Sequence, residues 1–445
     1  PVWSAVLQQC TRSFGHARID SSIRRAMSRF FHYDTGRLYC EGVPAADLVA
    51  AHGTPLYVYS RASIVERFCD FERAFAGVER LICYSVKANG NLAILRLLAE
   101  QGSGADIVSG GELHRARLAG IPADRIVFSG VGKTITEQAA ALEAGIYGFN
   151  VESESELWSL SQLANTMNVR APIAIRVNPD IESPTPHQYT RTGHLATKFG
   201  VPMADAPRLY RLAASLPGLW IRGVDVHIGS QILEVEPYRL ALMRVLELVG
   251  QLRSEGITLE YIDLGGGFGV SYEGEPGPNA AHFAAALIPE LGGTGLRVIL
   301  EPGRYILAPS GVLLTRVLTV KESAAKNFVI TDAGMNDLLR PSHYASYHHI
   351  ASAEQHSGRD RMHVDVVGPI CETGDFLALD RELERVLEGE LLVVGTAGAY
   401  GFSMASNYNA RPRPGEVLVD GERFTLIRKR ETYDDLVRGE IELLD

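Results

Sequence analysis

Four short apolar runs in the chain each end beside residues that could do chemistry. Lys87 closes the run in LICYSVK and offers an amine, and His227 in DVHIGSQ offers a flat imidazole ring. Three glycines, residues 265–267, follow the run in DLGGGFG and could turn several backbone N–H groups toward one anion. Glu301 in LEPGR places a carboxylate where burial demands a cation or a strong hydrogen-bond donor.

Each of these signals has an ordinary explanation when it is taken alone. A lysine at a strand end is usually a solvated charge, a strand histidine is usually a satisfied core residue, and a glycine run often forms only a tight turn. Together, however, an amine, a ring, an anion cradle and a carboxylate are the parts that bind pyridoxal 5′-phosphate (PLP). If Lys87 packs against a buried strand, desolvation should favour its neutral, nucleophilic form.

These residues need a scaffold that brings the ends of several strands together. From about residue 80 to 305 the chain alternates between β-prone runs and amphipathic stretches such as TITEQAAALEAG. Eight strands are expected, near residues 81–86, 105–108, 126–129, 147–151, 173–177, 221–228, 260–264 and 297–301. This alternation predicts a (β/α)8 barrel of the TIM type, in which chemistry gathers at the carboxyl ends of the strands. A doubly wound open sheet is the structural alternative.

The sequence outside the barrel predicts a second domain. Short β-rich runs separated by Gly, Pro and Asp turns, such as LLVVGTAGAYG, indicate an all-β domain over residues 306–445. Residues 28–60 should join it, so the barrel, residues 61–305, would be an insertion between its two parts. Residues 1–27 carry four arginines against one acidic residue and are expected to be a disordered extension, either a targeting peptide or residues upstream of the natural start.

The composition argues against several classes of function. The formal net charge is −10 without a long basic block, so neither nucleic acid nor an anionic membrane is an expected partner. No apolar run reaches the roughly 18 residues that a membrane span needs. The five cysteines are widely spaced and form no CxxC pair, so neither a metal site nor a disulfide framework is expected, and a reducing cytoplasm is the simplest location.

Nine motifs occur in order between about residues 30 and 435. They are YSVKANGN, GADIVSGGEL, KFGV, HIGSQI, DLGGGFG, EPGR, LLRPSHY, GPICETGD and AYGFSMASNYNARPRP. The set resembles the PLP-dependent decarboxylases of the alanine-racemase fold, and within them the branch that acts on diaminopimelate. The resemblance implies a PLP-bound barrel, a C-terminal β domain, and an obligate head-to-tail homodimer with its two active sites at the interface.

The resemblance also implies a role for individual residues. Lys87 matches the Schiff-base lysine that the substrate amine displaces, His227 the residue stacked on the cofactor ring, and Glu301 the partner of the pyridine nitrogen. Cys371 matches a residue donated across the dimer that would reprotonate Cα after decarboxylation, with Lys87 as a second candidate. The remaining cofactor-binding positions are Ser230, Gly265, Gly266, Gly267, Gly303, Arg304 and Tyr400.

A pair of arginines favours a substrate with a second carboxylate, because a buried carboxylate needs paired cations or several donors. The expected reaction converts meso-2,6-diaminopimelate to L-lysine and CO2, the last step of lysine biosynthesis. The substrate-binding positions would be Arg304, Arg340, Tyr344, Glu372 and Tyr400. The alternatives are a sister decarboxylase acting on ornithine, arginine or carboxynorspermidine, and a non-catalytic regulatory homologue. Glu372 and the arginine pair argue against the first alternative, and the presence of both Lys87 and Cys371 argues against the second.

Overall fold

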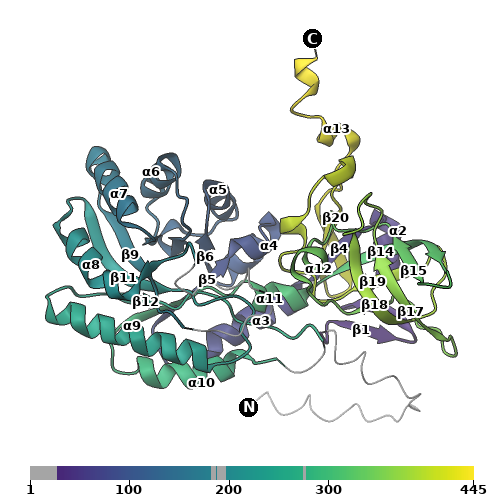
Figure 1. Ribbon diagram of the computed structural model, residues 1–445, viewed down its shortest axis with the longest axis horizontal. Helices are drawn as coiled ribbons and strands as arrows, with labels where there is room; N and C mark the ends of the chain where they lie inside the picture. The colour runs from purple at the N-terminus through teal and green to yellow at the C-terminus, as the bar shows by residue number, and fades with distance from the viewer. Residues whose placement is uncertain (1–27, 182–186, 188–196, 274–276, 445) are drawn as a thin grey trace, which may run out of the picture.

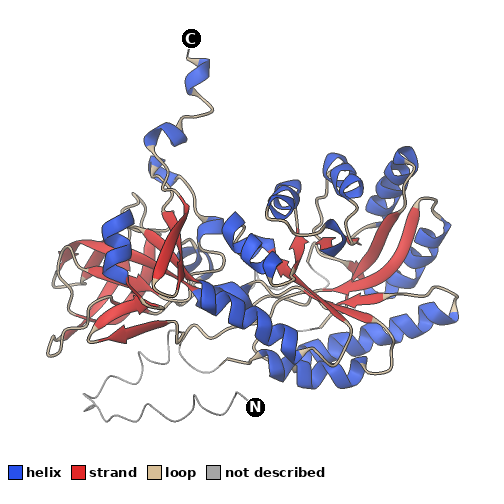
Figure 2. Cartoon of the chain, turned by 180° about the vertical axis from the view of Figure 1, so that it is seen from behind, coloured by secondary structure: helices blue, strands red, loops and turns tan. Residues whose placement is uncertain are grey.

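The computed structural model describes residues 28–181, 187, 197–273 and 277–444, so the expected extension over residues 1–27 lies outside the described residues. Figure 1 shows two bodies side by side, a barrel with its surrounding helices and a second body built mainly from strands. The view from behind in Figure 2 shows helices around the strands of the first body and few helices in the second.

Eight parallel strands form the first body. Each pairs with the next, and the last pairs with the first, which closes the barrel. They are β5 (Arg80–Ser85), β6 (Gly104–Ile107), β7 (Ile126–Phe128), β8 (Gly148–Val151), β9 (Ala171–Asn178), β11 (Leu219–Val226), β12 (Tyr261–Asp263) and β13 (Arg297–Leu300), with the two-residue β10 (Val201–Pro202) beside β9. The predicted barrel is therefore confirmed, and the doubly wound open sheet is wrong.

Helices cover the outside of the barrel, and polar side chains cap the N-termini of several of them shortly after a strand. The side chains of Ser109, Thr134 and Ser153 each accept a backbone N–H from the first turn of the helix that follows. These caps fix where each loop at the carboxyl end of a strand gives way to helix. The helices are α3 (Arg61–Ala74), α4 (Leu92–Glu100), α5 (Gly110–Leu118), α6 (Ile135–Ala144), α7 (Glu154–Met167), α8 (Ala206–Ser215), α9 (Glu236–Ser254) and α10 (Ala280–Leu291).

The second body is a sheet that combines the two ends of the described chain. The early strand β4 (Leu56–Ser60) lies between two late strands, antiparallel to β14 (Gly311–Lys321) and parallel to β20 (Gly415–Asp420). The other strands are β15 (Phe328–Thr331), β16 (Ile350–Ser352), β17 (Arg361–Val367), β18 (Phe376–Glu384), β19 (Leu391–Val394) and β21 (Arg423–Arg428). A small sheet of β1 (Phe31–Asp34), β2 (Arg37–Cys40) and β3 (Val43–Pro44) packs with α2 (Ala45–His52) beside it.

The two bodies share one hydrophobic core, which keeps the barrel mouth and the sheet in a fixed relation. Tyr57 and Tyr59 on β4 belong to the same buried cluster as Ile82 on β5 and Leu313 on β14. Two short helices lie at the junction, α11 (Arg304–Leu307) after the last barrel strand and α12 (Arg340–Tyr344) in the sheet body. The short helix α13 (Tyr433–Leu436) lies in the C-terminal segment that leaves the sheet in Figure 1. Within the described part of the chain, no helix has the length and apolar character needed to span a bilayer.

Candidate active site

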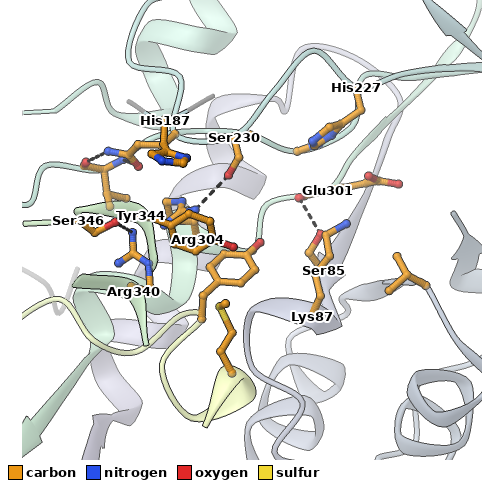
Figure 3. A pocket seen from close by; sticks show the side chains of 18 of the residues that line it. Ser85, Lys87, His187, His227, Ser230, Glu301, Arg304, Arg340, Tyr344 and Ser346 are labelled. Carbon is orange, nitrogen blue, oxygen red and sulfur yellow. Dashed lines mark hydrogen bonds between the residues drawn. The ribbon is translucent and has the colours of Figure 1, made fainter. Parts of the chain in front are cut away.

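A cavity of 960 Å³ lies between the carboxyl ends of the barrel strands and the sheet body. This volume is at the upper end of the range for small-molecule sites. Figure 3 shows Lys87, Ser85 and Glu301 on one side of it, and Arg340, Tyr344 and Ser346 on the other. The predicted site residues that line the cavity are Lys87, His227, Ser230, Gly266, Gly267, Glu301, Gly303, Arg304, Arg340, Tyr344 and Tyr400.

Lys87 lies in the short 3-10 turn Val86–Ala88 that follows β5, and its amine reaches a buried carboxylate. Its Nζ donates to Asp106 Oδ2 at 2.8 Å, and Ser85 Oγ donates to the same oxygen at 2.5 Å. Burial alone would lower the pKa of Lys87, but the carboxylates of Asp106 and Glu301 outweigh it, and the pKa is raised. The expectation of a neutral, desolvated amine is therefore wrong, because the neighbouring carboxylates favour the ammonium form of Lys87.

The imidazole of His227 is neutral and its tautomer is fixed by the glycine loop. The backbone N–H of Gly266 donates to His227 Nδ1 at 3.0 Å, which leaves the ring proton on Nε2. Burial, followed by the charges of Arg176 and Lys87, lowers the pKa of His227 well below its usual value. The loop needs glycine here, because a Cβ on Gly266 would lie 2.4 Å from the carbonyl oxygen of Glu301. Gly265 does not line the cavity, and its N–H donates to Asp263.

Four buried carboxyl groups gather at this side of the cavity, where Asp225 and Glu301 line it and Asp106 and Asp263 interact with them. Burial, then the neighbouring Asp106 and Asp263, raises the pKa of Glu301 well above its usual value. Arg176 lies 3.7 Å from Asp225 and partly compensates this negative cluster. The atom Oε1 of Glu301 has no hydrogen-bond partner among the described residues, which is a costly state for a buried carboxyl oxygen. This oxygen is therefore ready to receive a donor from a bound molecule.

On the opposite side, Arg304 and Arg340 flank the ring of Tyr272. Arg304 donates to Tyr272 Oη at 2.8 Å and to Ser230 Oγ at 3.1 Å, and the guanidinium of Arg340 lies 4.7 Å from the Tyr272 ring centre. Burial would raise the pKa of Tyr272, but the two arginines outweigh it and lower that pKa. The Nε of each arginine lacks a hydrogen-bond partner within the described residues. This side of the cavity is therefore a buried, positively charged site that suits an anion.

Tyr400 connects the sheet body to the turn that carries Lys87. Its backbone N–H donates to the carbonyl of Ala88 at 2.8 Å, and its ring lies 4.8 Å from the guanidinium of Arg304. The residue has φ +55°, a conformation that a tyrosine rarely adopts, so the surrounding contacts must hold it there. The sheet body therefore helps to position both Lys87 and one arginine.

Cys371 and Glu372 do not reach this cavity within one chain. Both are exposed in the loop between β17 and β18, and the N–H of Cys371 donates to the side chain of Asn409 at 2.8 Å. Neither residue lines the cavity that contains Lys87. Of the predicted site residues, these two are the ones that the structure does not bring together with the rest, because Gly265, although it does not line the cavity, accepts the backbone N–H of Glu301 at 2.8 Å.

The comparisons with known proteins identify the family. The family model described as pyridoxal-dependent decarboxylase, pyridoxal binding domain, matches residues 61–308. The chain is 50% identical to diaminopimelate decarboxylase from Pseudomonas fluorescens, over 92% of this chain and 98% of that protein. It is 49% identical to the enzyme of the same name from Aquifex aeolicus, over 93% and 98%. The chain belongs to the diaminopimelate decarboxylase family.

A solved structure of this family agrees with the fold. Diaminopimelate decarboxylase from Helicobacter pylori, complexed with L-lysine, superposes with a TM-score of 0.86 at 43% identity, covering 90% of this chain and all of that one. The cofactor of such decarboxylases is PLP. The residues present here fit that cofactor on observed grounds: an amine at Lys87, an unpartnered carboxyl oxygen on Glu301 for a protonated ring nitrogen, and a glycine loop beside Arg304.

Four residues that contact the site were not singled out from the sequence. Asp106 and Arg176 both lie toward the carboxyl ends of barrel strands, so the rule that located Lys87 could have located them. Tyr272 and His348 lie in loops, where no strand pattern marks them. Tyr272 meets Arg304 within the barrel, and His348 meets Arg340 within the sheet body, whereas the packing of the two bodies brings Tyr272 against Arg340 and His348.

Proposed function

We propose that this chain decarboxylates meso-2,6-diaminopimelate to L-lysine and CO2 with PLP as cofactor. The observation that carries the proposal is the pair Arg304 and Arg340, two buried guanidinium groups across the cavity from Lys87 with unpartnered Nε atoms. A substrate with one amino acid centre at Lys87 and a second carboxylate at the arginines would satisfy both ends. The relatives named above support this substrate, and L-lysine, bound in the H. pylori relative, would be the product.

We propose the following roles toward the cofactor. Lys87 would hold PLP covalently, His227 would lie against its ring, and Glu301 would hold its ring nitrogen. When bound, PLP supplies an electron sink for the pair released from the bond between Cα and the lost carboxylate. The phosphate would be held by cavity-lining groups near the glycine loop, namely Ser230, Gly266, Gly267, Gly303, Arg304 and Tyr400. Gly265 would only shape the loop, because its N–H is committed to Asp263.

The chain's own groups can manage the protons of this reaction. Asp106 accepts a hydrogen bond from Lys87 Nζ and favours the ammonium form, so a base other than Asp106 would have to take that proton before the amine could react. Lys87, once it is free again, would be the second candidate, after Cys371, to return a proton to the reacting carbon. A protonated ring nitrogen beside Glu301 would favour the ionised form of this carboxyl and oppose the effect of burial on its pKa, so the two charges would stabilise each other.

We further propose that two copies associate head to tail, so that the partner copy supplies Cys371 and Glu372 to the cavity. Their exposure and their separation from the cavity of their own chain support this arrangement. Cys371 would protonate the reacting carbon, and Glu372 would pair with the distal ammonium of the substrate. Arg340, Tyr344 and Tyr400 from the sheet body would complete the distal site.

We propose a barrel domain over residues 61–305 and a β domain formed by residues 28–60 together with 306–445. The sharing of one sheet by β4, β14 and β20 supports that division. A cytoplasmic location is proposed as well, and it is supported by the four described cysteines, Cys40, Cys69, Cys83 and Cys371, which form no disulfide with one another.

The direct experiment incubates the purified protein and PLP with meso-diaminopimelate and assays L-lysine and CO2. The proposal predicts equimolar release of both products, lost in Lys87→Ala. Release of CO2 from ornithine or arginine but not from diaminopimelate would contradict the proposal and would favour the alternative of a sister decarboxylase.

A further inference from the structure

His348 lies directly behind the arginine pair, in the segment between α12 and β16. It is fully buried, and its Nε2 lies 2.9 Å from Nη1 of Arg340. Its Nδ1 lies 2.9 Å from the backbone carbonyl oxygen of Gly395, and its ring meets the ring of Tyr272 edge-on at 5.3 Å. The histidine therefore contacts both Arg340 and the tyrosine that separates the two arginines.

The partners of His348 determine its tautomer. The carbonyl of Gly395 can only accept, so Nδ1 carries the ring proton. In the neutral ring Nε2 is then an acceptor, and Nη1 of Arg340 donates to it. Burial, followed by the charge of Arg340, lowers the pKa of His348 to about 3, which agrees with a neutral ring.

A neutral acceptor such as His348 orients the guanidinium of Arg340 without cancelling its charge, unlike the carboxylate that more commonly pairs with a buried arginine. A carboxylate would orient the guanidinium and also cancel its charge. Among the described residues, neither Arg304 nor Arg340 forms an ion pair. Nη1 of Arg340 is held by His348 and Nη2 by Ser346 at 3.3 Å, while the buried Nε has no hydrogen-bond partner among the described residues.

We propose that His348 is a positioning residue for substrate selection: it fixes the orientation of Arg340 through an uncharged hydrogen bond and so leaves both arginines fully charged for a distal carboxylate. This inference rests on the proposed function, since it assumes that the distal carboxylate binds at these arginines. Other groups near the histidine agree with it, because Arg381 donates to the backbone carbonyl of His348 and adds positive rather than negative charge.

Three substitutions separate orientation from charge. His348→Gln keeps a neutral acceptor, His348→Leu removes the acceptor, and His348→Glu keeps an acceptor but adds a negative charge beside Arg340. His349→Gln is a matched control, because His349 is the next residue, is only partly buried, and does not line the cavity. Each variant is loaded with PLP, and its cofactor absorbance and thermal unfolding are compared with those of the wild type.

The first readout is steady-state kinetics with meso-diaminopimelate. His348→Leu and His348→Glu should raise KM about tenfold or more, since each loses the oriented or the charged guanidinium, while kcat changes by less than about threefold. His348→Gln should restore KM to within about threefold of the wild type. A folded, PLP-loaded His348→Glu variant with the KM of the wild type, or with a fall in kcat alone, would overturn the proposal.

The second readout does not need turnover. Pimelate, a dicarboxylate of the same chain length without amines, is titrated into each PLP-loaded protein by calorimetry. Binding should weaken about tenfold or more in His348→Glu and stay near wild type in His348→Gln and His349→Gln. A wild type that binds pimelate but does not decarboxylate diaminopimelate would contradict the proposed function alone. Equal pimelate affinity in His348→Glu and the wild type would contradict the role of His348 alone.

Discussion

Lys87 Nζ and Asp106 Oδ2 lie 2.8 Å apart at the ends of neighbouring barrel strands, and Asp106 is fully buried. The carboxylate of Asp106 raises the pKa of Lys87 and so keeps its amine protonated until another base removes the proton. A protonated amine cannot attack a carbonyl. Asp106 therefore controls the pH above which the Lys87 amine becomes a nucleophile.

Replacing Asp106 by Asn should lower the pKa of Lys87, because the carboxylate that outweighs the effect of burial is removed. Attachment of PLP to Lys87 should then become faster at neutral pH, and its midpoint on a pH scale should move down. The rate can be followed by absorbance, with borohydride trapping to confirm that Lys87 is the site. An unchanged midpoint would mean that Asp106 does not control the charge of the amine.

Replacing Arg340 by Ala should raise KM for meso-diaminopimelate about thirtyfold or more, because a buried charge-assisted contact is lost. The effect on kcat should be smaller, since Arg340 is far from the bond that breaks. Arg359→Ala is the control, because Arg359 pairs with Glu390 in the sheet body and does not line the cavity. Equal KM values for the two variants would remove Arg340 from substrate binding.

Replacing Cys371 by Ala should leave PLP binding intact, because the residue lies outside the cavity of its own chain. It should reduce turnover strongly, because the proposed proton donor to the reacting carbon is removed. If the partner copy supplies it, mixing Cys371→Ala with inactive Lys87→Ala should restore activity. Random exchange makes about half of the dimers mixed, each with one complete site, so about a quarter of wild-type activity is expected. No recovery after verified subunit exchange would show that the active site is not shared.

The pKa of His348, lowered to about 3 from 6.5, makes stability depend on pH. Between these values the unfolded chain binds a proton that the folded chain does not, so stability falls as the pH falls below about 6.5. From pH 7 to pH 5 this group should cost about 2 kcal/mol of unfolding free energy. Urea unfolding of His348→Gln should show a pH dependence smaller by that amount, and identical pH dependence in both proteins would contradict a buried neutral His348.

The barrel and the site residues at its strand ends were predictable, because both depend on the local alternation of apolar runs and amphipathic stretches. Apolar runs mark the strands, and parallel strands bring their carboxyl ends together, so Lys87, His227 and Glu301 had to converge. The charge state of Lys87 was not predictable, since it depends on Asp106 from the neighbouring strand. The role of His348 depends on its contact with Arg340 across a turn of irregular chain in the sheet body, which no periodicity encodes. Cys371 could be placed only by resemblance, because one chain leaves it exposed.

The central claim is that the two arginines select a substrate with a second carboxylate. The most direct test is the ratio of kcat/KM for meso-diaminopimelate to kcat/KM for L-lysine, which has the same backbone but lacks that carboxylate. The account predicts a ratio of about 10³ or more for the wild type, because lysine would leave two buried guanidinium groups unpaired. It also predicts that Arg340→Ala reduces this ratio. A wild type that decarboxylates lysine and diaminopimelate with similar kcat/KM would contradict the account.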